Sequence, residues 1–174
     1  MATPPRWVEC AGCWLALVLS TAAAAAQPAI AEMQPPVRPL CLTSPFGIRP
    51  APGADAPGFH NGIDLRAASG AYVYAVAEGN IVTIHRRGPG GLELAIAHQG
   101  SLGRYVSLYA HLGQILPAFA QGRTHVKAGE RIARIGRTGV TYGTHLYFEL
   151  LVDGKPVDPA PLFPVQPCAR RGDP

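Results

Sequence analysis

The stretch His145-Leu-Tyr-Phe-Glu-Leu-Leu-Val152 decides the fold class, because its side chains change character at every position. Successive side chains of a β-strand point to opposite faces of the sheet. One face of this stretch is uniformly apolar and consists of Leu146, Phe148, Leu150 and Val152. The other face begins with polar side chains and consists of His145, Tyr147, Glu149 and Leu151. The pattern predicts a strand that packs its apolar face on a core and turns His145 and Tyr147 away from it.

A second stretch, Tyr105–His111 (YVSLYAH), alternates in the same way. Its alternation predicts a core face of Val106, Leu108 and Ala110. The opposite face then holds Ser107, His111 and two tyrosines, of which we expect Tyr109 to line a groove and Tyr105 to pack. Both strands place a histidine near one end of the non-core face, which is typical of a surface groove. Two exposed strand histidines are the alternative interpretation.

Further short apolar runs are separated by turns rich in glycine and proline. They cover residues 71–77, 81–85, 92–98 and 130–135. The 174 residues include 20 Gly and 18 Pro, and only 15% are charged, which disfavours a helical bundle, a coiled coil or a charge-rich disordered chain. Many short strands at this spacing predict one all-β domain, with at most a turn or two of helix within residues 113–120.

An apolar run without charge or proline covers residues 11–26, after a short segment that contains Arg6. The run ends in small residues, which is the layout of a secretory signal peptide. We expect residues 1–26 to be this signal, with cleavage after Ala26 or Ala31, and the protein to be periplasmic or secreted. An uncleaved anchor is the alternative, although the run is shorter than the ~20 residues that a spanning helix needs.

The four cysteines fall into two groups. Cys10 and Cys13 lie within the expected signal, whereas Cys41 and Cys168 bracket the expected domain, residues 41–168. In an oxidising compartment, such a pair predicts a disulfide that ties the two ends of the domain together. Two unpaired thiols in loose flanks are the alternative.

Residues 27–40 are rich in proline and are expected to form an extended linker, and residues 169–174 a disordered tail. The net charge is +4, which suits weak contact with anionic wall polymers or membrane surfaces. No dense Lys/Arg stripe or nucleic-acid motif is present, so nucleic acid is not an expected partner. After signal cleavage we expect no stable membrane insertion.

The remaining histidines differ in what surrounds them. His60 and Asp64 lie in FHNGID, where Gly62 predicts a loop running into a strand that can turn both side chains to one point. Imidazole and carboxylate are common zinc ligands, although this spacing alone is a weak signal. We expect His98 to be structural or to lie at the rim of the groove. His85 and His125 are expected on the surface.

Five motifs in order resemble the M23 peptidases, the lysostaphin/LytM-type zinc endopeptidases that cut peptidoglycan cross-bridges. The motifs are Ser44–Arg49, His60–Asp64, Tyr109–His111, Gly136–Gly139 and Gly143–Glu149. The resemblance covers residues 42–163. It implies an open antiparallel β-sheet core with short hairpins, related to the barrel-sandwich hybrid.

The resemblance also implies roles for individual residues. His60 and Asp64 look like the first two zinc ligands, and His111 and His145 like the catalytic histidines. Zinc would polarise the scissile carbonyl and lower the pKa of water to about 7, and two imidazoles could stabilise the oxyanion and shuttle a proton. The implied function is an exported metallo-endopeptidase that hydrolyses the peptide cross-links of peptidoglycan.

Tyr147 departs from the family pattern, because it stands where the family has a histidine as its third zinc ligand. Three interpretations follow: Tyr147 binds metal as a tyrosinate, His145 or His111 replaces the missing ligand, or the site is metal-free. The last interpretation predicts a degenerate LytM-like domain that binds peptidoglycan or activates a partner amidase. A phosphotransfer or carrier domain, suggested by VKAGERIARIG (residues 126–136), is disfavoured by the export signal and by FHNGID.

Overall fold

The structure is a computed structural model that describes Met1, residues 33–49 and residues 58–169. Its strands are β1 (Leu42–Ser44), β2 (Gly47–Ile48), β3 (Phe59–His60), β4 (Ile63–Arg66), β5 (Tyr72–Tyr74), β6 (Gly79–His85), β7 (Leu92–Gly100), β8 (Gly103–Ile115), β9 (His125–Val126), β10 (Arg131–Ile135), β11 (His145–Val152) and β12 (Lys155–Val157). Two short helical segments are α1 (Pro117–Ala120) and the 3₁₀ turn Ala160–Leu162. The all-β prediction is confirmed, as is the single helical turn within residues 113–120.

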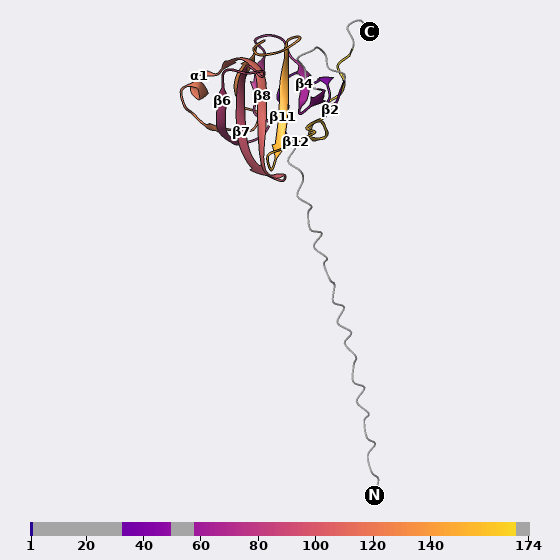
Figure 1. Cartoon of the computed structure of the whole chain (residues 1–174). Helices are drawn as coiled ribbons and strands as arrows, with labels where there is room; N and C mark the ends of the chain where they lie inside the picture. Colours follow the sequence, from indigo (N-terminus) through magenta and orange to yellow (C-terminus); the bar gives the residue numbers. More distant parts are fainter. Residues whose placement is uncertain (2–32, 50–57, 170–174) are drawn as a thin grey trace.

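Ten of these strands form one sheet with the central order β1-β4-β11-β8-β7-β6-β9, and every strand pair in it is antiparallel. β10 pairs with both β5 and β8, β12 extends β11, and β2 and β3 form a separate hairpin. In Figure 1, α1 lies at the β6 side of the sheet, and β2 and β4 lie at the opposite side. No helix within the described residues is long and apolar enough to cross a membrane.

β11 has the faces that its alternation predicts. Leu146, Phe148 and Leu150 are fully buried in the core, and His145 and Tyr147 are half-buried on the other face. β11 lies between β4 and β8, with Tyr147 opposite Asp64 on one side and Ala110 on the other. The polar face of β11 therefore forms the middle of a surface built from three strands.

The predicted core face of β8 is wrong, and so is the expected position of Tyr109 in the groove, whereas Tyr105 packs as expected. Tyr105, Ser107 and Tyr109 are buried, whereas Val106 and Leu108 are half-exposed. Tyr109 is fully buried because its ring packs edge-on against Phe148 and its hydroxyl accepts a hydrogen bond from the Val76 amide. The hydroxyls of Ser107 and Tyr109 thus have partners inside the core, so the strand buries the face that looks more polar.

Residues 33–40 are not an extended linker as expected. Met33 and Val37 belong to the core, and the Gln34 amide donates a hydrogen bond to the carbonyl of Val76. The apolar side chains at positions 33 and 37 provide the physical reason, because they add buried surface to the domain. The domain therefore extends back at least to Met33. Apart from Met1, the predicted signal peptide lies outside the described residues, as do residues 27–32 and 170–174.

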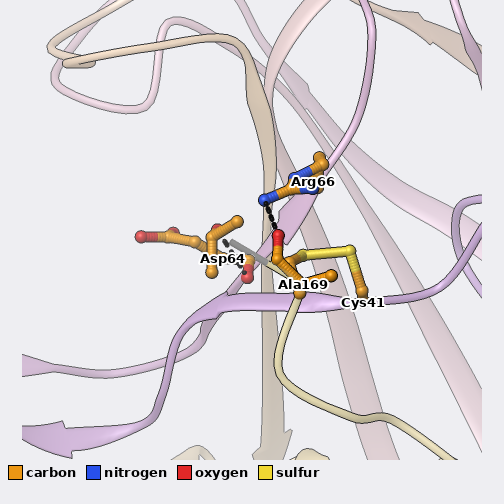
Figure 2. The surroundings of a disulfide bond; sticks show 6 residues. Cys41, Asp64, Arg66 and Ala169 are labelled. Carbon is orange, nitrogen blue, oxygen red and sulfur yellow. Dashed lines mark hydrogen bonds between the residues drawn. A yellow bond between two sulfur atoms is a disulfide. The ribbon is translucent and has the colours of Figure 1, made fainter. Parts of the chain in front are cut away.

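A disulfide joins Cys41 and Cys168, which are 127 positions apart (Figure 2). The bond lies next to β4, because the Cys41 carbonyl accepts a hydrogen bond from the Arg66 amide. The Arg66 guanidinium in turn donates to the carbonyl of Ala169. Cys168 and Ala169 are thereby held against the strand that contains Asp64.

Candidate functional site

A groove of about 1340 Å³ opens on the face of β4, β11 and β8 that points away from the core. The five residues assigned to the site from sequence all line it, together with one more residue of β11. They are His60, Asp64, His111, His145, Tyr147 and Glu149. The structure therefore brings together residues that are up to 89 positions apart in the chain.

His60 enters the groove from the β2–β3 hairpin, and its ring is almost completely buried. Its Nδ1 lies 2.8 Å from the carbonyl oxygen of Pro45, so the proton sits on Nδ1, which donates this hydrogen bond. The lone pair of Nε2 is then free, and among the described residues Nε2 has no hydrogen-bond partner. A backbone carbonyl that orients one ring nitrogen is the arrangement typical of metal-binding histidines.

Gly62 allows β4 to approach β11 closely. A Cβ atom at this position would lie 2.3 Å from the carbonyl oxygen of Phe148 and 3.0 Å from the Tyr147 ring. Only glycine therefore fits between His60 and Asp64 without pushing the strands apart.

The carboxylate of Asp64 lies between the rings of His60 and His145 and the side chain of Arg49. Its Oδ1 lies 3.2 Å from Nε2 of His60 and 3.4 Å from Nε2 of His145, and its Oδ2 accepts a hydrogen bond from Arg49 at 3.3 Å. Burial raises the pKa of the Asp64 carboxyl, but the neighbouring imidazoles of His145 and His60 outweigh this effect, so the net pKa lies well below its usual range. Asp64 is therefore a permanently charged carboxylate.

His111 reaches the groove through a β-bulge. Leu92 and Leu94 of β7 face Leu112 and Tyr109 of β8, so β8 contains one extra residue in this interval. His111 has φ of +60°, a left-handed conformation that histidine tolerates better than most residues. Bulges change the direction of a side chain in this way.

The His111 ring is held by one hydrogen bond. Its Nδ1 lies 2.8 Å from the carbonyl oxygen of Thr138, to which it donates. Burial lowers the pKa of His111, although the bond to Thr138 acts in the opposite direction. The ring is therefore neutral at physiological pH, with a free Nε2.

His145 has the same kind of anchor. Its Nδ1 lies 3.1 Å from the carbonyl oxygen of Gly143, and its ring centre lies 4.9 Å from that of His111. Two imidazoles fixed through Nδ1 thus stand side by side in the groove. They can accept or donate a proton through Nε2.

Tyr147 does not point a free oxygen at the other site residues. Its hydroxyl donates a 2.7 Å hydrogen bond to Oε2 of Glu149. Burial raises the pKa of Tyr147 strongly, and the Glu149 carboxylate adds to this effect. The phenol therefore keeps its proton, which a metal ligand would have to lose.

Two residues of the site, His60 and Asp64, are placed as ligands of one zinc ion would be. In a tetrahedral site, metal–ligand distances of 2.0–2.2 Å put neighbouring ligand atoms about 3.4 Å apart, close to the spacing of Asp64 Oδ1 from His60 Nε2. The unpartnered Nε2 of His60 also fits. Within residues 33–49 and 58–169, however, no three His, Cys, Asp or Glu side chains are placed to hold a metal ion together. Tyr147 does not fit as the third ligand in this arrangement.

Sequence reasoning gave no role to several residues of the groove. Arg49 lies in the Ser44–Arg49 motif, and its Nη1 also donates to Ser44 Oγ at 2.6 Å. Glu149 shares a strand face with Tyr147, so the period-two pattern could have revealed their pairing. Glu93 of β7 lines the same groove, but nothing local in the sequence indicates this, because it depends on the pairing of β7 with β8.

The other histidines lie where they were expected. His98 is buried and structural, with Nδ1 bonded to the Glu78 carbonyl and Nε2 2.7 Å from Ser107 Oγ. His85 and His125 are exposed on the surface.

A histidine–aspartate pair beside two anchored imidazoles, in a groove on an open antiparallel sheet, defines a domain of the metallopeptidase type. The model of peptidase family M23 matches residues 58–159, and the chain belongs to this family.

Bacterial relatives agree with this assignment. The DD-carboxypeptidase/endopeptidase Mpg of Neisseria meningitidis is 38% identical over 126 residues, which are 71% of this chain and 28% of that protein. The murein hydrolase activator NlpD of Salmonella dublin is 37% identical over 109 residues, 62% of this chain and 27% of that protein. A zinc-containing peptidase from Vibrio cholerae superposes with a TM-score of 0.60 at 33% identity, covering 71% of this chain and 37% of the other. The chain spans less than a third of the length of these two curated relatives.

Proposed function

We propose that this protein is an exported hydrolase that cuts peptide cross-links of peptidoglycan. The observation that supports it is the pair of imidazoles, His111 and His145, anchored 4.9 Å apart beside His60 and Asp64. A relative named DD-carboxypeptidase/endopeptidase supports the same substrate class. Export by residues 1–26 belongs to the proposal, and the disulfide favours it because such bonds persist in oxidising compartments.

In this function the two imidazoles handle the proton and the oxyanion. A neutral Nε2 of one ring accepts a proton from the attacking water and returns it to the leaving amine, while the neighbouring ring stabilises the developing oxyanion. The lowered pKa of His111 suits the role of base. His60 and Asp64 would hold zinc, which polarises the scissile carbonyl and lowers the pKa of bound water.

The hydrogen bond from Tyr147 to Glu149 favours a second candidate function. With its third ligand position occupied by a neutral phenol, the domain would bind peptidoglycan peptides in the groove without cutting them. It could then activate a partner amidase, as the name of the relative NlpD, a murein hydrolase activator, suggests. The two candidates share the groove and its ligand and differ in whether a metal is bound.

Metal content and cleavage of purified sacculi separate the two functions. Zinc bound one to one, together with release of cross-link fragments that stops with EDTA and in a His111→Ala variant, supports the peptidase. If the protein binds no zinc and cuts no cross-links, but still binds sacculi and stimulates a purified amidase, the activator function is supported. Absence of cleavage, sacculus binding and amidase stimulation contradicts both.

A further inference from the structure

Arginine and tyrosine side chains alternate on the outer face of β5 and β10. Tyr72 and Tyr74 point outward, because Val73 between them is fully buried. The register places Arg134 opposite Tyr72 and Arg131 opposite Tyr74. We name this surface the Arg–Tyr patch and define it by Arg38, Tyr72, Tyr74, Arg131 and Arg134.

The guanidinium groups of the patch are held in place by the rings. Those of Arg131 and Arg134 lie 4.2 and 3.9 Å from the centre of the Tyr72 ring, and that of Arg38 lies 4.6 Å from the centre of the Tyr74 ring. Arg134 also donates to the Gly70 carbonyl. Stacking orients the planar forks before any ligand arrives, so less conformational entropy is lost on binding.

Within residues 33–49 and 58–169, these charges have no acidic partner. Among the described residues, the ion pairs of arginine are those of Arg49 with Asp64 and Arg123 with Glu130. Arg38 and Arg131 are exposed, so their charges face solvent. The exposed guanidinium groups of Arg38 and Arg131 are suited to carboxylates or phosphates, which each can bind with two hydrogen bonds, whereas Arg134 already donates to the Gly70 carbonyl and the Tyr72 hydroxyl.

The patch is continuous with the groove. Arg38 also lines the groove, as does Arg66 of β4, which lies opposite His145 at the start of β11. A polymer that occupies the groove can therefore continue over the patch at this end. The large exposed apolar side chains of the described domain, Ile48, Phe59, Val82, Val140 and Tyr142, lie outside the patch, which argues against insertion into a lipid surface.

We propose that the Arg–Tyr patch is a second binding surface for peptidoglycan, which recognises the free carboxylates of stem peptides next to the one held in the groove. The proposal rests on the proposed function for the nature of the polymer. The patch then determines how tightly the domain binds the wall, and the groove determines what happens to the bound peptide.

Binding of the purified protein to sacculi at low and high salt tests the proposal. In Arg38→Gln/Arg131→Gln, we expect roughly tenfold weaker binding at low salt, the sum of two exposed charge contacts. The difference should disappear at high salt because of screening. Arg87→Gln/Arg104→Gln removes the same charge from two other exposed positions and should bind like the wild type. Arg38→Lys/Arg131→Lys keeps the charge without the fork and should be intermediate.

Chemical modification of the wall identifies the ligand. Wild-type binding should fall to the level of the glutamine variant on sacculi whose carboxyls have been converted to amides. Equal binding of variant and wild type, or undiminished binding to amidated sacculi, contradicts the proposal. If the glutamine variant loses binding only to phosphatidylglycerol vesicles, the patch binds membranes, and this result also contradicts the proposal. If the wild type binds and acts on sacculi and the glutamine variant binds them equally well, only the patch proposal fails. If the wild type does not bind sacculi, both the patch proposal and the proposed function fail.

Discussion

The hydroxyl of Tyr147 donates a hydrogen bond to the carboxylate of Glu149, its neighbour two positions along the same face of β11. The bond occupies the side chain that, by the resemblance of the sequence motifs, takes the position of the family's third zinc ligand. Since burial and the Glu149 charge both raise the pKa of this phenol, its deprotonation by a metal is costly. The identity of one side chain therefore separates the two candidate functions.

Restoring an imidazole at this position should restore the metal site. In Tyr147→His we expect zinc affinity to rise by at least about 100-fold, because even losing an outer partner of a ligand costs about 10–100-fold. Sacculus cleavage should rise with it. Isothermal titration with zinc and a cleavage assay measure the two effects.

The control is Tyr147→Phe, which removes only the hydroxyl. If the hydroxyl is not a ligand, this variant keeps the zinc affinity of the wild type. A large loss of affinity in Tyr147→Phe would show that Tyr147 binds the metal as it stands, and lower activity in Tyr147→His would support the same conclusion.

Gly62→Ala should loosen the site without removing any of its polar groups. The new Cβ would lie 2.3 Å from the Phe148 carbonyl oxygen, so β4 must move away from β11. We expect the free energy of unfolding to fall by about 1–3 kcal/mol, as in other overpacked positions, and groove binding to weaken. Gly58→Ala is the matched control, because its Cβ would meet nothing within 4 Å. Equal stability of the two variants by urea denaturation would contradict this account.

The fold was predictable where side-chain character alternates clearly. β11 buries Leu146, Phe148 and Leu150 because no polar group competes for that face. The faces of β8 were not predictable, because the burial of Tyr109 depends on an amide donor at Val76, 33 positions away. Period-two reasoning treats tyrosine and serine as polar and has no means of seeing such a partner.

The members of the site were predictable, but their geometry was not. Motif order indicated His60, Asp64, His111 and His145. The position of His111 depends on an extra residue in β8 relative to β7, which is a property of strand pairing and not of local sequence. The anchors of the rings, the carbonyls of Pro45, Thr138 and Gly143, are backbone atoms that carry no sequence signal.

The bulge makes position 111 sensitive to the shape of its side chain. With φ of +60°, a left-handed residue other than glycine costs about 1–2 kcal/mol, and asparagine is among those that adopt it readily. We expect the free energy of unfolding of His111→Asn to lie within about 1 kcal/mol of the wild-type value. That of His111→Val should be about 1–2 kcal/mol lower than that of the Asn variant. His145→Val on the regular strand β11 controls for the loss of an imidazole. Similar losses in the two valine variants would refute the role of the bulge.

The disulfide should contribute a large part of the stability. It closes a loop with a separation of 127 residues, and removing a native disulfide from a small secreted domain costs about 2–5 kcal/mol. We expect Cys41→Ser/Cys168→Ser to lower the urea midpoint accordingly, and a reducing agent to do the same to the wild type but not to the variant. An unchanged midpoint under reduction would argue against this bond.

The buried His98 should make the domain less stable in mild acid. Burial lowers the pKa of His98 below its usual 6.5, against the effect of its bond to the Glu78 carbonyl. Since Nδ1 donates to that carbonyl, Nε2 must accept a hydrogen bond from Ser107 Oγ, 2.7 Å away, and a proton on Nε2 would break this bond.

The pKa of His98 is lower in the folded chain than in the unfolded chain, and this difference determines the direction of the pH effect. As the pH falls below about 6.5, the unfolded chain takes up a proton that the folded chain refuses, so the free energy of unfolding falls until the lower folded pKa is passed. Urea denaturation between pH 7.5 and 5 should therefore show a steeper loss in the wild type than in His98→Gln. His125→Gln, an exposed histidine on β9, controls for changing a histidine as such. Identical pH slopes in the wild type and His98→Gln would mean that this imidazole is protonated equally in the folded and unfolded chains.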